Sequence, residues 1–146
     1  MQYTQPELNS LNYTASTNGG CIVVNIVISN SSDEPIYLQI VNQIKEQIIK
    51  GELSDSQPLP SIRNLARELN ISVITTKRAY DELEKDGFIV SVAGKGSYVA
   101  PINNEMLREA KIRMIEEKMT DAVSTAKMLG LTLDELTEML KLIYEG

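Results

Sequence analysis

The segment from Leu59 to Val99 constrains the fold more than any other part of the chain. It predicts two short amphipathic helices joined by a tight turn, and then a β-hairpin whose turn contains Gly94 and Gly96. Ser72 suits the N-cap of the second helix, because its hydroxyl can accept a hydrogen bond from a backbone N–H of the first turn. The four β-branched residues after it, 73–76, are mediocre helix formers. Helix stability therefore does not explain these four residues, which indicates a functional role for their side chains. The order of two helices and a hairpin predicts a winged helix-turn-helix.

The second of these helices has two different faces. At about 100° per residue, four residues share a face that is apolar enough to pack on a core: Thr76, Ala79, Tyr80 and Leu83. The opposite face presents Ile74 with the cations Lys77 and Arg78. A recognition helix places such side chains in the major groove, where methyl groups contact thymine and cations contact guanine or phosphate. The alternative is a solvated face on which Asp81 pairs with Lys77 one helical turn away.

The positive charge of the chain is concentrated on the two predicted helices. The formal net charge is −6, which by itself argues against a nucleic-acid partner. Residues 61–78, however, carry four Lys or Arg side chains against one acid, whereas residues 1–34 carry three acids and no base. A local positive field matters more for docking on a duplex than the sum over the whole chain.

Arg63 and Lys95 extend this pattern of cations. Ser61 is predicted to cap the first helix, so Arg63 lies in its first turn, where the helix dipole disfavours a cation by ~0.3–1 kcal/mol. An external anion such as a DNA phosphate explains that placement, and an arginine that only packs its stem is the alternative. Lys95 lies between two glycines that permit close approach to a phosphate backbone. The alternative there is an ordinary turn with a solubilising lysine.

The composition argues against an enzyme, and no catalytic residue is predicted. The chain has no His, the usual general base and commonest metal ligand, and its single cysteine, Cys21, excludes an intrachain disulfide. A nucleotide-binding phosphate loop is excluded because position 89 is Ile and Lys95 is followed by Gly96 instead of Ser or Thr. We expect no metal, no cofactor and no membrane span, and a cytoplasmic location as the default.

The chain is predicted to contain three parts: an N-terminal extension over 1–34, a winged helix-turn-helix domain over 35–101 and a helical dimerisation region over 102–146. Within the extension, the polar residues 1–20 predict disorder or only local structure, and a short strand is expected near 21–28. No Met lies between Met1 and Met106. A natural start at a non-Met codon near Val24 or Val27 is therefore a hypothesis, which the intact mass of the native protein would test.

The tail after residue 101 predicts a helical partner. A long helix is expected from Asn104 to Leu129, and within it apolar residues recur three and four apart from Ile112 to Leu129, in a heptad pattern. Thr132 with Glu135 forms a capping box for a second helix. Two helices alone bury their apolar stripes poorly, so a second copy of the chain is favoured, with packing on the chain's own winged domain as the alternative. The predicted dimer interface consists of Ile112, Ile115, Met119, Ala122, Ala126, Leu129, Leu136 and Leu140.

Several motifs in register resemble the GntR family of bacterial transcription regulators. They include Pro35-Ile36-Tyr37-Leu38-Gln39-Ile40, Leu59-Pro60-Ser61-Ile62-Arg63, Thr76-Lys77-Arg78-Ala79-Tyr80 and Gly94-Lys95-Gly96-Ser97-Tyr98. The resemblance implies that Ser61, Arg63, Thr75, Lys77 and the turn 94–96 contact DNA. The chain departs from the family at Val73, where Arg is frequent, and at Ser56, where Gly is frequent. Its short tail is similar to the YtrA-type subfamily, which implies a dimer made by small helices and frequent repressor activity.

These patterns together predict an α+β, mainly α, sequence-specific DNA-binding transcription regulator. A repressor that binds a palindromic operator as a homodimer is the favoured form. The predicted DNA contacts are Ser61, Arg63, Val73, Ile74, Thr75, Lys77, Arg78, Gly94, Lys95 and Gly96. The alternative is a ligand-sensing or protein-interaction module whose winged helix does not bind DNA. The two are distinguished by duplex binding that falls steeply with salt, which only a DNA-binding protein would show. The sequence leaves open an unidentified small-molecule effector, the operator and the regulated genes.

Overall fold

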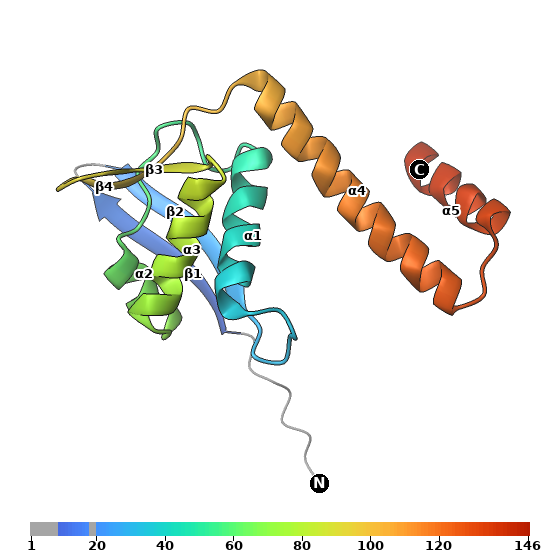
Figure 1. The fold of residues 1–146 in the computed structure, drawn as a ribbon, viewed down its shortest axis with the longest axis horizontal. Helices are drawn as coiled ribbons and strands as arrows, with labels where there is room; N and C mark the ends of the chain where they lie inside the picture. Colours follow the sequence, from blue (N-terminus) through green and yellow to red (C-terminus); the bar gives the residue numbers. More distant parts are fainter. Residues whose placement is uncertain (1–8, 18–19) are drawn as a thin grey trace, which may run out of the picture. The chain divides into compact units, whose positions relative to one another are not determined.

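The described residues, 9–17 and 20–146 of this computed structural model, divide into two units between Asn103 and Asn104 (Figure 1). Along the chain the elements are β1 (Asn9–Thr17), β2 (Gly20–Ile28), α1 (Ile36–Ile49), α2 (Ile62–Leu69), α3 (Val73–Lys85), β3 (Ile89–Val92), β4 (Gly96–Val99), α4 (Asn104–Met128) and α5 (Leu133–Glu145). The first unit is the winged helix-turn-helix, and the second consists of the two C-terminal helices. None of the described helices is both long enough and apolar enough to cross a membrane.

Local hydrogen bonds set the ends of the two central helices, as the sequence predicts. The Ser61 hydroxyl accepts the backbone N–H of Asn64 at 3.2 Å, and the Ser72 hydroxyl accepts that of Thr75 at 3.0 Å. Between the helices, Asn70 takes the left-handed conformation with φ of 54°, which asparagine tolerates better than most residues. The turn from α2 to α3 is therefore short, and it fixes the angle at which α3 leaves α2.

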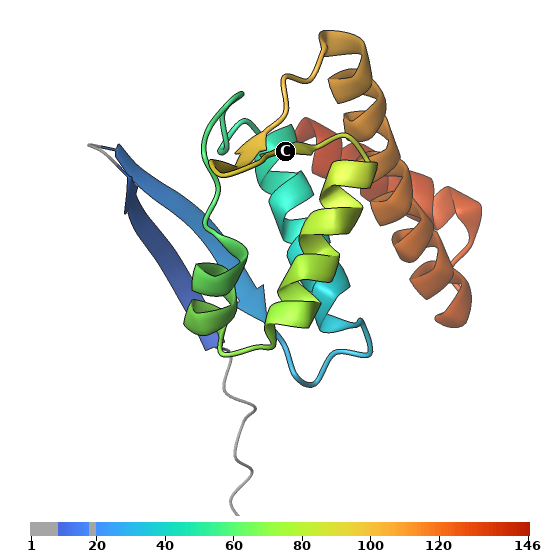
Figure 2. The same cartoon turned by 60° about the vertical axis from the view of Figure 1, so that its left-hand side comes forward.

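The hydrophobic core of the first unit lies between its helices and strand β2. The predicted inner face of α3 is confirmed, since its buried residues are Thr76, Ala79, Tyr80 and Leu83. Ile89 of β3 and Val99 of β4 close the core on the side of the wing, the hairpin that β3 and β4 form. Figure 2 shows α3 on one side of α1 and α2, and the hairpin of β1 and β2 on the other side.

The wing is the antiparallel pair of β3 and β4, with Ile89 opposite Val99 and Val92 opposite Gly96. The segment before α2 pairs with the other edge of β4, because Ser56 N–H donates to Val99 O at 3.0 Å and Val99 N–H donates to the carbonyl of residue 57 at 2.9 Å. Ser56 has a φ of 61°. Serine therefore keeps the left-handed turn here, for which glycine is the usual residue.

The N-terminal region differs in part from the expectation. The strand near 21–28 is confirmed as β2, but the expectation of disorder or only local structure over 1–20 did not include the strand that Asn9–Thr17 forms, β1. The two strands pair antiparallel, from Asn9 opposite Ile28 to Thr17 opposite Gly20. Pairing uses backbone groups, so a polar strand without an apolar period can pair once its neighbour is anchored. The rest of that expectation, at 1–8 and 18–19, lies outside the described residues.

Three glutamines of α1 complete the hydrogen bonding of β2. Gln47 accepts the N–H of Asn25 at 3.1 Å and donates to its carbonyl at 2.8 Å, and Gln43 makes the same pair of bonds to Val27 at 2.8 Å each. Gln39 accepts the N–H of Ser29 at 2.8 Å and donates to its carbonyl at 3.0 Å. Each side-chain amide thus replaces one residue of a neighbouring strand. The helical spacing of four residues, about 6 Å along the axis, is close to the two-residue repeat of the strand edge, about 6.6 Å.

We predict that this glutamine ladder stabilises the first unit unequally along its length. Gln47 is 7% exposed, whereas Gln43 is accessible to water. Gln47→Leu leaves the backbone groups of Asn25 without partners in a buried place and should lower the free energy of unfolding by ~1–3 kcal/mol. Gln43→Leu is the matched control and should cost less than about 1 kcal/mol, since water can replace the amide. Urea denaturation measures both, and equal losses would contradict this account.

The second unit buries little of its own apolar surface. The capping box is confirmed: the Thr132 hydroxyl accepts the N–H of Glu135, and the Glu135 carboxylate accepts the N–H of Thr132 at 2.8 Å. No residue of α5 is buried, and Ala126 is the buried residue of α4. Ala126 is 5% exposed at the point where the chain reverses, with Leu131 N–H donating to its carbonyl at 2.9 Å. Ala126, a member of the predicted dimer interface, is thus covered by its own chain and leaves little side-chain surface for a partner.

Candidate nucleic-acid interface

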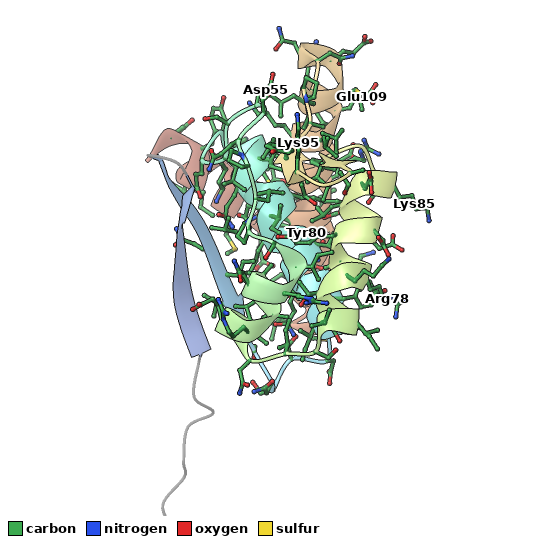
Figure 3. The ribbon with its side chains drawn as sticks, turned by 90° about the vertical axis from the view of Figure 1, so that its left-hand side faces the viewer. Asp55, Arg78, Tyr80, Lys85, Lys95 and Glu109 are labelled. Atoms are coloured by element: carbon green, nitrogen blue, oxygen red, sulfur yellow. The ribbon has the colours of Figure 1, made fainter. Side chains whose placement is uncertain are left out.

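One buried hydrogen bond connects the helices that carry the candidate contacts. The phenol of Tyr80, on the inner face of α3, donates to the Pro60 carbonyl at 2.6 Å, immediately before α2 begins. Next to it, the N–H of Leu59 donates to the carbonyl of Ser97 in β4 at 2.9 Å. Figure 3 labels Tyr80 in the interior of the unit, in contrast to Arg78 and Lys85 at the outer side of α3. The start of α2, the helix α3 and the wing therefore share one hydrogen-bonded frame.

The start of α2 presents one hydroxyl and one cation to solvent. Ser61 and Arg63 are both exposed, and the Ser61 oxygen already accepts the capping bond from Asn64. Arg63 makes no ion pair or hydrogen bond within the described part of the chain. Arg67, one turn further on, donates to the Asn64 side chain at 3.1 Å. Arg63 is thus the cation of α2 whose donors remain available for an external anion.

The first turns of α3 expose two aliphatic side chains and hold a third predicted contact more tightly. Val73 is 48% exposed and Ile74 is 81% exposed, although both are large apolar residues. Thr75 is half-buried, and its hydroxyl lies 2.8 Å from that of Ser72. The exposure of Val73 and Ile74 agrees with the inference that these β-branched residues are not chosen for helix stability. Their methyl groups could contact thymine in a major groove.

Lys77 and Arg78 are engaged in different ways. Lys77 forms an ion pair with Asp81 at 2.7 Å, the pairing expected for a solvated face, and both side chains remain more than half exposed. Such exposed pairs contribute about 0.3–0.5 kcal/mol, so a phosphate or a base can compete for the lysine. Arg78 stacks its guanidinium on the ring of Tyr37 in α1, with the carbon Cζ 3.8 Å from the ring centroid.

The wing turn presents Lys95 between two glycines in unusual conformations. Gly94 has a φ of 74° and Gly96 a φ of 106°, and the N–H of Lys95 donates to the Val92 carbonyl at 3.0 Å. A Cβ atom at either glycine would meet nothing within 4 Å. The glycines are therefore required by the backbone conformation of the turn. The side chain of Lys95 is exposed, and Figure 3 shows it at the wing.

The predicted site residues thus lie at three places on one frame, and two supporting residues were missed. Sequence reasoning placed Tyr80 on the apolar face but did not foresee its bond to Pro60, and it gave Tyr37 no role. Neither contact has a local signal, because the partners lie 20 and 41 positions apart in the sequence. Within 9–17 and 20–146, no group of three or more His, Cys, Asp or Glu is placed to hold a metal ion.

Comparison with known proteins identifies the family. Residues 36–99 match the family described as bacterial regulatory proteins, gntR family. The HTH-type transcriptional repressor YtrA of Bacillus subtilis (strain 168) is 36% identical over 116 residues, which cover 80% of this chain and 89% of that protein. The chain belongs to the GntR family. A second relative of this GntR-family chain, the uncharacterized HTH-type transcriptional regulator YhcF of the same strain, is 35% identical over 79% of this chain and 94% of its own length.

Solved structures have a similar fold. A GntR family transcriptional regulator from Listeria monocytogenes has a TM-score of 0.67 and 28% identity, over 78% of this chain and 97% of that one. A transcriptional antiterminator from Listeria monocytogenes EGD-e has a TM-score of 0.62 and 31% identity, over 80% and 87% of the two chains. The matched family region begins at Ile36, so the hairpin of β1 and β2 precedes it.

We predict that Tyr80→Phe weakens the frame of the interface. Removing the phenolic hydroxyl leaves the Pro60 carbonyl without this buried donor, so the free energy of unfolding should fall by ~1–3 kcal/mol in urea denaturation. Tyr98→Phe is the matched control. Its hydroxyl donates to the Lys95 carbonyl at 3.2 Å at an exposed site where water can take its place. Similar losses in the free energy of unfolding for both variants would show that the buried Tyr80 bond contributes no more to stability than the exposed Tyr98 bond.

Proposed function

We propose that this GntR-family protein is a repressor that binds a palindromic DNA operator as a homodimer. Membership of the family makes the chain a DNA-binding transcriptional regulator and not an enzyme. The observation that carries the finer proposal is the shared frame of α2, α3 and the wing, with exposed Arg63, Lys77 and Lys95 distributed over it. A role on the bacterial chromosome implies a cytoplasmic location.

The proposed contacts fall into two classes by their chemistry. Val73 and Ile74 are suited to apolar contact with thymine methyl groups, and Lys77 to a guanine edge or a phosphate. Ser61 and Arg63 at the start of α2, with Lys95 in the wing turn, are suited to the phosphate backbone or to an adjacent base edge. Because Val73 stands where arginine is frequent in the family, the operator of this chain should differ from those of relatives that carry the arginine.

We predict that Arg63→Ala and Lys77→Ala each weaken operator binding. The operator would first be found by mapping bound sites across the genome, and its affinity then measured by fluorescence anisotropy at fixed salt. A base contact is worth ~1–3 kcal/mol, so each variant should lose about 5- to 150-fold in affinity. Lys85→Ala removes another exposed cation from the last turn of α3 and should change affinity less than about threefold.

The outcomes of this experiment separate three possibilities. Unchanged affinity for both variants would reject the assignment of these two contacts. A uniform loss over all duplex sequences, with a lower salt slope, would mean that they bind phosphate and not bases. No salt-dependent duplex binding at all would reject DNA recognition and favour a ligand-sensing or protein-interaction module.

The second unit supports the proposed homodimer through its exposed apolar surface. The exposed fractions are 55% for Ile115, 47% for Met119, 73% for Leu129 and 50% for Leu140. A large apolar surface of this kind on a soluble chain marks a protein contact. A two-fold dimer would also supply the second copy of the DNA-binding unit that a palindromic operator requires. The proposed interface keeps the other predicted residues, Ile112, Ala122 and Leu136, without Ala126.

We predict that Ile115→Glu dissociates the dimer. A carboxylate placed in an apolar interface without a partner should cost several kcal/mol and weaken self-association at least about 100-fold. Glu117→Gln, on the opposite face of α4, is the control and should leave association unchanged. Sedimentation velocity gives the mass of each variant. A wild-type chain that sediments as a monomer would contradict the proposal, as would an Ile115→Glu variant that remains dimeric.

A further inference from the structure

The stacked pair of Arg78 and Tyr37 joins a cation of α3 to the first turn of α1. The guanidinium carbon lies 3.8 Å from the centroid of the tyrosine ring. Tyr37 is half-buried and packs against the core, so the ring is a fixed platform, whereas Arg78 is exposed. Figure 3 shows Arg78 projecting from the outer side of α3, together with Lys85 two turns further along.

Stacking leaves the hydrogen-bonding capacity of Arg78 unused. The aromatic ring covers one flat face of the guanidinium, while the N–H donors point outward in its plane. Within the described part of the chain, Arg78 makes no ion pair and no hydrogen bond. Lys77 beside it is paired with Asp81. Arg78 is therefore held in one orientation with its donors still available, which is the arrangement suited to bidentate binding of a phosphate.

We propose that Tyr37 is a positioning residue, which holds the Arg78 guanidinium ready to bind a backbone phosphate of the duplex. The inference rests on the proposed DNA binding and adds to it a residue outside the helix-turn-helix. Its physical basis is that a platform removes the rotamer freedom of arginine before the phosphate arrives, so less is lost on binding. Tyr37 acts through Arg78 and needs no contact of its own with DNA.

A purely structural role for the pair makes a different prediction. At the other end of the same two helices, Lys45 pairs with Asp86 at 2.6 Å and lies 5.2 Å from the ring centroid of Phe88. That contact fastens α1 to the end of α3. Phe88→Leu removes a ring from beneath a cation without changing the charge, so it is the matched control for Tyr37→Leu. If the contact of Tyr37 with Arg78 only holds the two helices together, the two variants should change DNA affinity to the same extent.

The test uses the full chain and a fluorescein-labelled 30-base-pair duplex of mixed sequence, because a phosphate contact needs no particular base. Affinity is measured between 50 and 200 mM salt. Arg78→Ala should lower the slope of log K against log salt by about 0.9 and weaken binding about eightfold at 0.1 M salt. Tyr37→Leu should cause a large part of the same eightfold loss of affinity. Tyr37→Phe keeps the ring and should bind the duplex as tightly as the wild type. In the Arg78→Ala background, Tyr37→Leu should cause no further loss.

Several results would overturn the inference. An unchanged salt slope for Arg78→Ala while the wild type binds would do so, as would independent losses from Tyr37→Leu and Arg78→Ala. A loss for Tyr37→Phe as large as for Tyr37→Leu would mean that the phenol contacts DNA itself. Equal losses for Tyr37→Leu and Phe88→Leu would indicate a fastening. If Tyr37→Leu does not fold, Tyr37→Met serves in its place. Absent binding by the wild type would instead refute the proposed function, and the inference with it.

Discussion

The buried bond from the Tyr80 phenol to the Pro60 carbonyl is the interaction on which the rest of the interface depends. It fixes α3 against the start of α2, and the neighbouring bond from Leu59 to Ser97 fixes that start against the wing. Recognition of a duplex requires its contacting groups to be held to within about 0.5 Å. Besides the shared hydrophobic core, these two bonds join three short elements from separate parts of the chain, the start of α2, the helix α3 and the wing.

The cations on this frame differ in how the protein holds them. Within the described residues, Arg63 and Lys95 have no internal partner, Lys77 has a weak exposed one, and Arg78 has an aromatic platform. These arrangements have different costs on binding, because an ion pair must be broken, whereas a stacked arginine keeps its contact. The acidic remainder of the chain opposes indiscriminate attachment to polyanions, so local placement decides where DNA can bind.

The N-terminal hairpin shows how a chain can add to a family fold without changing it. The matched GntR region begins at Ile36, and β2 is attached before it by the amides of Gln39, Gln43 and Gln47. Those amides satisfy one edge of β2, and β1 satisfies the other. An unpaired strand edge invites association with other chains. The glutamine ladder removes that edge while it also closes the core.

Local patterns along the chain were enough to predict the features that depend on nearby residues: the Ser61 and Ser72 caps, the inner face of α3, the capping box of α5 and the family motifs. Their signals are hydrogen bonds and periodicities that span only a few positions, so a short segment shows them without the rest of the chain. The predicted DNA and dimer contacts remain predictions. The Tyr80 bond, the Tyr37 contact, the pairing of β1 and the burial of Ala126 became visible only in the folded chain. Each of these depends on which groups the folded backbone brings together. The residues next to a polar strand, a buried tyrosine or an alanine in a heptad do not indicate which distant group it will contact.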